Sequence, residues 1–242
     1  MKNHFRCNFL RIALTICFII SAVGSEKYDE SSERESMMSP VTSGYEEPCT
    51  GAYSVRNFSD DYRENDDRMN ILFLYADDWR FNTLGIMGNK YVKTPKIDQL
   101  GREGVLFTHN CVTTSICWSS RATLYSGKYT FRHQVYFDSY GCVNCGKIIQ
   151  ERLREAGYYV GHVGKWGIDG EQWCKYNDYY NEYSGWHWKK THGELWHITA
   201  KNEKDAVEFL RHRDTRKPFF LNVAFYATHA LLFETPQYEP QP

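Results

Sequence analysis

The sequence predicts an α/β protein in which a mostly parallel sheet is flanked by helices. After Asn70, short apolar runs alternate with segments of helical character, and this alternation is typical of strand–helix–strand units. The first run, 71–75, is apolar at every position, as in a strand that is buried on both faces. Apolar residues make up 42% of the 242-residue chain, which is enough to form a sizeable core.

Caps, breakers and periodicity place the other elements in order. Thr94 provides an N-cap and Pro95 a first-turn proline for a helix that extends to about Glu103. Glycine directly after a helical segment marks its end, as at Gly127 and Gly157. We therefore expect a strand at 105–108, helices at 119–126 and 147–156, a strand at 158–163, an amphipathic helix at 201–211 and a strand at 219–226.

Residues 1–24 have the features of a secretory signal peptide: basic residues first, an apolar core at 12–20, and small residues at 22–24. The apolar core is too short to cross a bilayer comfortably, which argues against a membrane anchor. The sequence has no second apolar run of spanning length. We therefore expect the chain to enter the secretory pathway and to have no stable membrane span.

Residues 25–67 are rich in Ser, Glu and Asp and have almost no apolar periodicity. Such a segment cannot bury enough apolar surface to offset the entropy lost on ordering it. We interpret it as a flexible acidic leader, and an acidic loop docked on the domain is the alternative. Within it, Asn57 begins a triplet that fits N-glycosylation. The folded domain is then expected at 68–242.

The charge balance and the cysteines limit the possible partners. The chain has 29 Lys and Arg against 30 Asp and Glu, and this argues against nucleic acid, whose binders use a basic excess. Cysteines beyond residue 24 would lie in an oxidising compartment, where disulfides are expected. Cys142 and Cys145 have the spacing of half a zinc site, but no matching second pair is present, so we expect a disulfide role.

Polar residues stand directly after three of the expected strands. Asp77 and Asp78 follow the first strand, Lys165 follows the strand at 158–163, and His229 follows the last one. In open α/β sheets, sites form beyond the carboxyl ends of the strands, so we expect these four residues to share one pocket. Two consecutive carboxylates after a buried strand suit a hard divalent cation such as calcium.

The segment 113–127, TTSICWSSRATLYSG, carries the most specific signal. It resembles the signature of the sulfatase family, C-x-P-S-R followed by a short helix and a glycine. Around it, five weaker motifs occur in the order found in that family: ADD at 76–78, TPKIDQL at 94–100, GVLFT at 104–108, GKW at 164–166 and ATH at 227–229. The resemblance covers about 70–238 and implies the alkaline-phosphatase-like fold of sulfatases, with a domain that we expect to be incomplete at its C-terminus.

In the sulfatase family the signature cysteine is oxidised to formylglycine, and the resemblance assigns this role to Cys117. The hydrated aldehyde offers two hydroxyls: one attacks sulfur and displaces the alcohol, and the other, once deprotonated, expels sulfate. Arg121, one helical turn later, would hold the hydrate oxygens. The implied partners are a formylglycine-generating enzyme during maturation and a sulfated small molecule or glycan as substrate, in a secreted or lysosomal setting.

The resemblance also implies roles for the residues at the strand ends. Asp77, Asp78 and the modified Cys117 would ligate Ca²⁺, which polarises the sulfate oxygens and lowers the pKa of the hydrate. Lys165 and His229 would neutralise charge on the sulfate. His229 would also protonate the leaving oxygen.

The sequence departs from the family pattern in three places. Ser119 stands where the signature has a proline, which is part of what the cysteine-oxidising enzyme recognises. Gly167 stands where many members have a histidine, and His187, His192 or His197 are the candidates to supply its role. The chain also lacks the later Asp-Asn or Asp-His pair of the family, so we expect an incomplete calcium shell and weak or no activity of this chain alone.

Two alternative functions fit parts of the sequence. A phosphoesterase of the same superfamily would use a Ser or Thr nucleophile and usually zinc, and both Cys117 and the shortage of metal-type histidines argue against it. A catalytically inactive protein would bind sulfated glycans through the cationic residues and the aromatic segment 166–196. Ser119, Gly167 and the missing later pair favour this second alternative.

Overall fold

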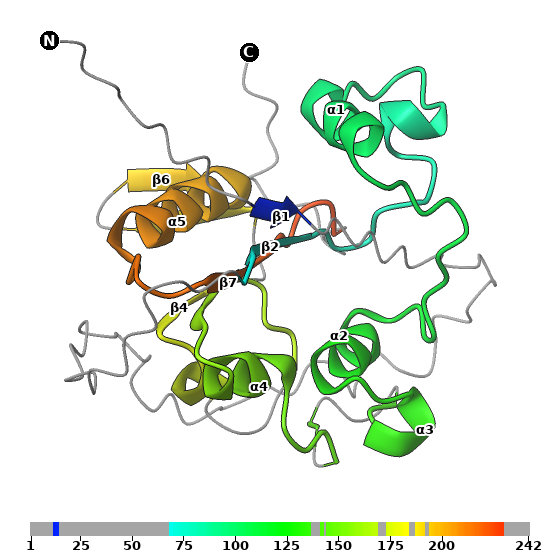
Figure 1. The fold of residues 1–242 in the computed structure, drawn as a ribbon. Helices are drawn as coiled ribbons and strands as arrows, with labels where there is room; N and C mark the ends of the chain where they lie inside the picture. The colour runs from blue at the N-terminus through cyan, green and yellow to red at the C-terminus, as the bar shows by residue number, and fades with distance from the viewer. Residues whose placement is uncertain are drawn as a thin grey trace, which may run out of the picture.

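The computed structural model describes residues 12–14, 68–136, 141–142, 144–168, 173–183, 187–191 and 194–229. Within these residues the chain forms a five-stranded sheet with the spatial order β1-β2-β7-β3-β4, and all four strand pairs are parallel (Figure 1). The prediction of a mostly parallel sheet is therefore confirmed. The strands are β1 (Ile12–Leu14), β2 (Asn70–Tyr75), β7 (Phe219–Ala224), β3 (Tyr159–Gly164) and β4 (Tyr179–Glu182).

The helices lie on both sides of this sheet, as expected (Figure 1). Helix α5 (Ile198–His212) covers one face, and α2 (Cys117–Ser126) and α4 (Ile149–Glu155) cover the other. The shorter elements are η1 (Gly85–Met87), α1 (Pro95–Glu103), α3 (Thr130–His133), η2 (Trp173–Tyr176) and an antiparallel pair of strands, β5 (Trp188–Thr191) and β6 (Glu194–His197).

Strand β7 lies at the centre of the sheet, and all six of its residues are buried. Side chains alternate between the two faces of a strand. Phe219, Leu221 and Val223 therefore pack in the cluster that contains Phe209 of α5. Phe220 packs in the cluster on the opposite face, which α2 and α4 help to cover. Because this strand buries side chains on both faces, it requires helices on both sides of the sheet.

Helix α2 carries the signature segment and has defined ends. Cys117 is its first residue, and Gly127 follows its last turn with a left-handed φ of 67° and a hydrogen bond from its N–H to the carbonyl of Thr123. Glycine adopts this conformation without a steric penalty, so it ends the helix here. The helix predicted at 119–126 is confirmed and begins two residues earlier. Its buried residues are Ser119, Ser120, Arg121, Ala122 and Tyr125.

The other predicted elements α1, α4, β3, α5 and β7 lie within a few residues of their expected bounds. The cap of α1 differs in detail, because the side chain of Thr94 makes no capping hydrogen bond to the helix backbone. Its hydroxyl instead donates to Asp98 Oδ1 at 2.7 Å and accepts the N–H of Gly85 at 2.9 Å. Thr94 therefore joins the start of α1 to η1.

The strand expected at 105–108 is wrong. These residues have no strand structure, and Val105 and Phe107 are 76% and 73% exposed. An apolar run becomes a strand only where a neighbouring backbone completes its hydrogen bonds. Within the residues that the structure describes, no strand pairs with this segment.

Of the first 67 residues, for which the sequence predicts a signal peptide and an acidic leader, the structure describes only residues 12–14. Residues 12–14 form β1, which pairs in parallel with β2, inside the segment expected to be a signal peptide. A cleaved segment cannot contribute a strand to the mature sheet, so cleavage after residue 24 stays a prediction. The acidic leader at 25–67 lies outside the described residues. Among those that are described, no helix combines the length and apolar character needed to cross a bilayer.

Candidate active site

The carboxyl ends of β2 and β7 are tied together by backbone hydrogen bonds. The N–H of Phe225 donates to the carbonyl of Tyr75 at 2.7 Å, and the N–H of Thr228 donates to the carbonyl of Asp77 at 3.3 Å. Asp77 is 4% exposed, and Asp78 adopts a left-handed φ of 53°, a conformation that aspartate tolerates better than most residues. The loop after β2 is therefore held beside the segment that carries His229.

Asp77 is the centre of a buried charge cluster. Lys165 Nζ donates to Asp77 Oδ2 at 2.6 Å, and Arg121 Nη2 lies 3.6 Å from the same oxygen. Arg121 is fully buried, and its Nη1 donates to the carbonyl of Lys165 at 2.7 Å. Its guanidinium lies 4.7 Å from the ring centre of Tyr75, a cation–π distance. Two cationic side chains thus meet one carboxylate, which leaves a net positive charge.

The guanidinium of Arg121 retains unused hydrogen-bonding capacity. Its Nε and Nη2 are buried and have no hydrogen-bond partner among the described atoms. A buried donor without an acceptor is costly, so such groups are usually satisfied by a ligand or water. An anion with several oxygens would supply the acceptors that Arg121 lacks.

Cys117 lies at the N-terminus of α2, one helical turn before Arg121, and its thiol is free and half-buried. The first backbone N–H groups of a helix are unpaired within it, and the helix dipole favours negative charge there. Burial is the main cause that raises the pKa of Tyr75 and Tyr226, and the charges of Asp77 and Cys117 raise it further. Cys117 therefore belongs to the same electrostatic neighbourhood as the buried cluster.

His229 joins this site from the segment after β7. Its Nε2 lies 3.9 Å from Asp78 Oδ2, and its ring stacks on Tyr226 with the ring centres 5.0 Å apart. The structure therefore brings all of the predicted strand-end residues to one edge of the sheet.

Two of the three histidines that the sequence offered as substitutes lie near this site. His187, which is 7% exposed, contacts the backbone carbonyl of His229 through Nε2 at 2.9 Å. The ring of His197 stacks on His187 with 6.1 Å between ring centres, and its Nδ1 accepts the N–H of Thr199 at the start of α5. His192 lies outside the described residues.

Gly167, where the family pattern often has histidine, has no room for a side chain. It has a φ of 74°, and a Cβ there would lie 2.8 Å from Arg121 Cδ and 3.4 Å from Lys165 Cε. The glycine therefore lets the backbone pass directly against the two cationic residues. This close approach was not visible in the sequence, where Gly167 was only a departure from a pattern.

The donor set for calcium is incomplete in the described part of the chain. No group of three or more His, Cys, Asp and Glu side chains in that part is placed to hold a metal ion. Asp77 and Asp78 have the oxygen chemistry that calcium prefers, but Asp77 Oδ2 is engaged by Lys165. The two carboxylates thus fit one side of a calcium site and do not form its whole shell.

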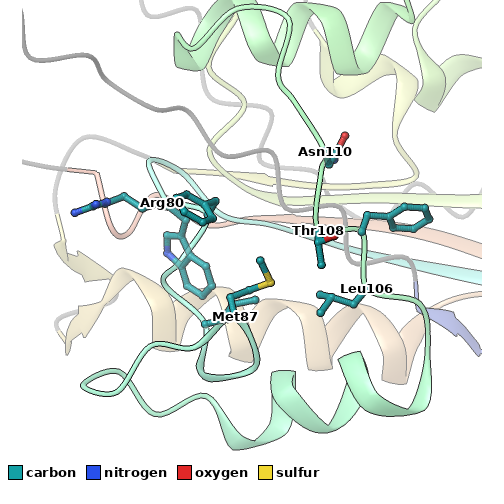
Figure 2. A pocket seen from close by; sticks show the side chains of 9 residues that line it. Arg80, Met87, Leu106, Thr108 and Asn110 are labelled. Carbon is teal, nitrogen blue, oxygen red and sulfur yellow. The ribbon is translucent and has the colours of Figure 1, made fainter.

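A pocket adjoins the chain directly after Asp78. Figure 2 shows Met87 and Leu106 facing each other across it, with the guanidinium of Arg80 directed away from both. The pocket is lined by Trp79, Arg80, Phe81, Leu84, Met87, Leu106, Phe107, Thr108 and Asn110.

Cys142 and Cys145, for which the sequence predicts a disulfide role, lie within disulfide distance of each other, with 5.3 Å between their Cα atoms.

The parallel sheet and the polar residues at the ends of β2, β3 and β7 define an α/β protein with a cationic site at one sheet edge. Comparison with known proteins gives the family: the sequence model of the sulfatase family matches residues 69–242. The chain belongs to the sulfatase family.

Several curated relatives support this membership. Human N-acetylgalactosamine-6-sulfatase is 28% identical over 209 residues, which covers 68% of this chain and 40% of the human protein. N-acetylglucosamine-6-O-sulfatase of Bacteroides thetaiotaomicron is 26% identical over 200 residues, and the match covers 77% of this chain and 35% of the bacterial protein. An ulvan-active sulfatase of Formosa agariphila is 33% identical over 107 residues, and the match covers 44% of this chain and 21% of that protein. The chain therefore spans less than half the length of these relatives.

Solved structures confirm the fold. A protein crystallised in complex with its substrate D-glucosamine-2-N,6-O-disulfate matches with a TM-score of 0.59 and 24% identity, covering 69% of this chain and 36% of that one. The phosphonate monoester hydrolase of Agrobacterium radiobacter matches with a TM-score of 0.53 and 23% identity, covering 67% and 42%. The expected alkaline-phosphatase-like fold of sulfatases is thus confirmed, and the same fold also carries phosphonate ester hydrolysis.

Proposed function

We propose that this chain carries the sulfate-binding and nucleophile-bearing part of a sulfatase that hydrolyses sulfate esters on carbohydrates. The observation that supports this most directly is the meeting of Lys165 and the unsatisfied Arg121 guanidinium at Asp77, beside the start of α2 where Cys117 lies. The sulfate group of an ester is tetrahedral and spreads its negative charge over three oxygens, so it needs cationic donors and helix N–H groups around them. These residues supply both.

Cys117 is the proposed nucleophile position. It is a free, half-buried thiol at a helix N-terminus, which fits a residue that is converted to formylglycine. Formylglycine at this position supplies, as its hydrate, one hydroxyl that attacks sulfur and a second whose deprotonation releases sulfate. Arg121 holds oxygens at position 117 through its Nε and Nη2, which have no hydrogen-bond acceptor among the described atoms. Maturation then requires a formylglycine-generating enzyme as partner in the secretory pathway.

Lys165 and His229 are proposed to stabilise the transition state. The ammonium of Lys165 neutralises charge on the sulfuryl oxygens, while Asp77 fixes its position. His229, whose Nε2 lies 3.9 Å from Asp78 Oδ2, donates a proton to the ester oxygen as the S–O bond breaks. The alcohol leaves neutral, and His229 recovers a proton from solvent before the next turnover.

Ca²⁺ is the proposed cofactor, held on one side by Asp77 and Asp78 and by the modified Cys117. When bound, it withdraws charge from the sulfate oxygens and from the nucleophile. These ligands are fewer than the six to eight oxygens, roughly, of a full calcium shell, so the described residues hold the ion from one side.

Carbohydrate sulfates are the proposed substrate class. The curated relatives are named for activity on N-acetylgalactosamine 6-sulfate, on N-acetylglucosamine 6-O-sulfate and on ulvan, and a structural neighbour was crystallised with a sulfated glucosamine. Trp188, a half-buried aromatic residue near the site, offers an apolar face on which a sugar ring can stack.

Mass analysis of the peptide that contains Cys117 tests the nucleophile directly. Protein from the native host should contain the aldehyde at position 117, and turnover of an aryl sulfate should disappear in Cys117→Ala. Cys111→Ala is the matched control, because Cys111 is a free, exposed thiol that takes no part in the site. An unmodified thiol at position 117 in an active protein would remove the aldehyde mechanism.

Phosphoester hydrolysis is a second candidate because the fold is shared with a phosphonate monoester hydrolase. The ratio of turnover on aryl sulfate and aryl phosphate separates the two. We expect sulfate to be preferred, since position 117 is a cysteine rather than a serine or threonine. Binding of sulfated glycan that survives Cys117→Ala and calcium chelation, without turnover by the wild type, would identify the inactive binding protein instead.

A further inference from the structure

Tyr226 lies between strand β7 and His229 and is 7% exposed. The N–H of His229 donates to the carbonyl of Tyr226 at 2.9 Å, which closes a tight turn over residues 226–229. This turn brings the side chain of His229 back over the ring of Tyr226, with 5.0 Å between ring centres and 17° between the ring planes. The aromatic ring therefore restricts the orientation of the imidazole.

The same ring contacts the second cationic residue of the site. Lys165 Nζ lies 4.9 Å from the centre of the Tyr226 ring, within the range of a cation–π interaction. One aromatic side chain thus touches both groups that we propose to act on the sulfuryl group, although Lys165 comes from the end of β3 and His229 from the segment after β7.

The backbone of this turn is fixed by two further contacts. Thr228 donates its N–H to the carbonyl of Asp77 at 3.3 Å, and His187 Nε2 donates to the carbonyl of His229 at 2.9 Å, because a carbonyl can only accept. The ring of His187 also lies 5.7 Å from that of Tyr226. The turn is therefore held by the loop after β2 and by the residue that precedes β5.

We propose that Tyr226 is a positioning residue of this site: its ring sets the relative placement of Lys165 and His229, while His187 holds the backbone of the turn. The inference rests on the sulfatase function proposed above. The inference adds Tyr226 and His187 to the proposed site, and neither residue belongs to a signature motif. The phenol of Tyr226 remains neutral, since burial raises its pKa and the charges of Asp77, Cys117 and Asp78 raise it further.

Three variants separate the ring from the hydroxyl and from general packing. Tyr226→Leu removes the aromatic face, Tyr226→Phe keeps the face and loses the hydroxyl, and Phe225→Leu removes a neighbouring, half-buried ring that packs in the core cluster. On an aryl sulfate, Tyr226→Leu should lower kcat by about 10- to 100-fold with little change in KM, because misplacement by about 1 Å of groups acting in the transition state costs rate. Tyr226→Phe should stay within about threefold of the wild type, and Phe225→Leu should do the same.

A second readout does not depend on turnover. The ring protons of His229, assigned in NMR spectra by comparison with His229→Gln, should be shifted upfield by the stacked ring in the wild type and in Tyr226→Phe. In Tyr226→Leu they should move to the position of an unstacked histidine, while the thermal unfolding midpoint matches that of Phe225→Leu.

The outcomes distinguish the two proposals. An unmodified thiol at position 117 in protein from the native host counts against the proposed function, and the NMR comparison still decides the role of Tyr226. An unchanged His229 signal in Tyr226→Leu overturns the positioning role. So does a kcat of Tyr226→Leu that equals the wild type, or a loss in Tyr226→Phe as large as in Tyr226→Leu.

Discussion

Lys165 Nζ donates a hydrogen bond to Asp77 Oδ2 at 2.6 Å, and the two residues are 88 positions apart in the sequence. They follow β3 and β2, which are separated in the sheet by β7. Their side chains are only 9% and 5% exposed. This ion pair therefore spans the end of the central strand and links the geometry of the site to the order of strands in the sheet.

Loss of this pair should affect both stability and activity. In Lys165→Met the buried carboxylate of Asp77 loses its 2.6 Å hydrogen bond and keeps only Arg121 Nη2 at 3.6 Å, and breaking a buried ion pair is costly. We expect the free energy of unfolding to fall by about 2–4 kcal/mol in urea titrations. Turnover of an aryl sulfate should also disappear.

The double variant Asp77→Asn, Lys165→Met is the control for this prediction. It removes both charges of the pair but leaves the buried Arg121 guanidinium without a carboxylate, so it should be no more stable than Lys165→Met and should show no turnover. A single Lys165→Met variant that unfolds at the same urea concentration as the wild type would show that the pair is not energetically important.

Substitution of Gly167 and Gly127 by alanine separates the cost of backbone strain from the cost of a steric clash. Gly167→Ala places a Cβ 2.8 Å from Arg121 Cδ at a left-handed φ, whereas Gly127→Ala adopts a similar φ of 67° with nothing within 4 Å of the new Cβ. Both should lose about 1 kcal/mol for the conformation. Only Gly167→Ala should lose more, about 1–3 kcal/mol in total, and turnover. Equal losses in thermal unfolding and full activity in both variants would contradict the close packing.

The fold was predictable from the sequence because its signals are local. The largely apolar run of β7, the proline at the start of α1 and Gly127 at the end of α2 each decide their element without reference to distant residues. The strand-end rule then places Asp77 and His229 at one edge, since it requires only that the strands are parallel.

The remaining features depend on contacts between distant segments. The run at 105–108 has the composition of a strand, but strand formation requires a partner that the run itself does not specify. His187 could not be distinguished from His192 and His197 in the sequence, because only the folded chain shows that it contacts the carbonyl of His229. The role of Tyr226 was missed for the same reason. An aromatic residue before the ATH motif was the only available signal.

The buried His162 should make the free energy of unfolding depend on pH. It is fully buried between Trp166 and Tyr180, and burial lowers its pKa to about 3. Its unfolded pKa is about 6.5, so below that pH the unfolded state binds more protons than the folded state. The stability contribution is therefore complete above about pH 6.5 and is lost as the pH falls towards 3, at up to about 1.4 kcal/mol per pH unit.

Urea unfolding at pH 7, 6 and 5 measures this slope. His162→Gln cannot titrate, so its stability should depend less on pH in this range, even if its stability at pH 7 is lower because the contacts of His162 with Gly164 and Asn222 are changed. Identical pH slopes in the two proteins would show that another group controls the acid sensitivity.

Ser119→Pro should increase the fraction of formylglycine at position 117. Ser119 is the third residue of α2, where a backbone N–H has no partner within the helix, so a proline there removes no helical hydrogen bond. The hydroxyl of Ser119 lies 3.5 Å from Thr130 Oγ1, which is too long for a strong hydrogen bond, so little stability is lost with it. The substitution restores the proline of the family signature, and the modifying enzyme should then act on a larger share of the chains.

Mass analysis of the peptide around Cys117 gives the modified fraction after co-expression with a formylglycine-generating enzyme. Ser119→Ala is the matched control, because it removes the hydroxyl without adding the ring and should stay at the wild-type level of conversion. The rise should be confined to Ser119→Pro, and aryl sulfate turnover per milligram should rise in the same proportion. If the serine and proline proteins are converted equally, recognition does not depend on position 119, and the departure of this chain from the signature has no effect on its maturation.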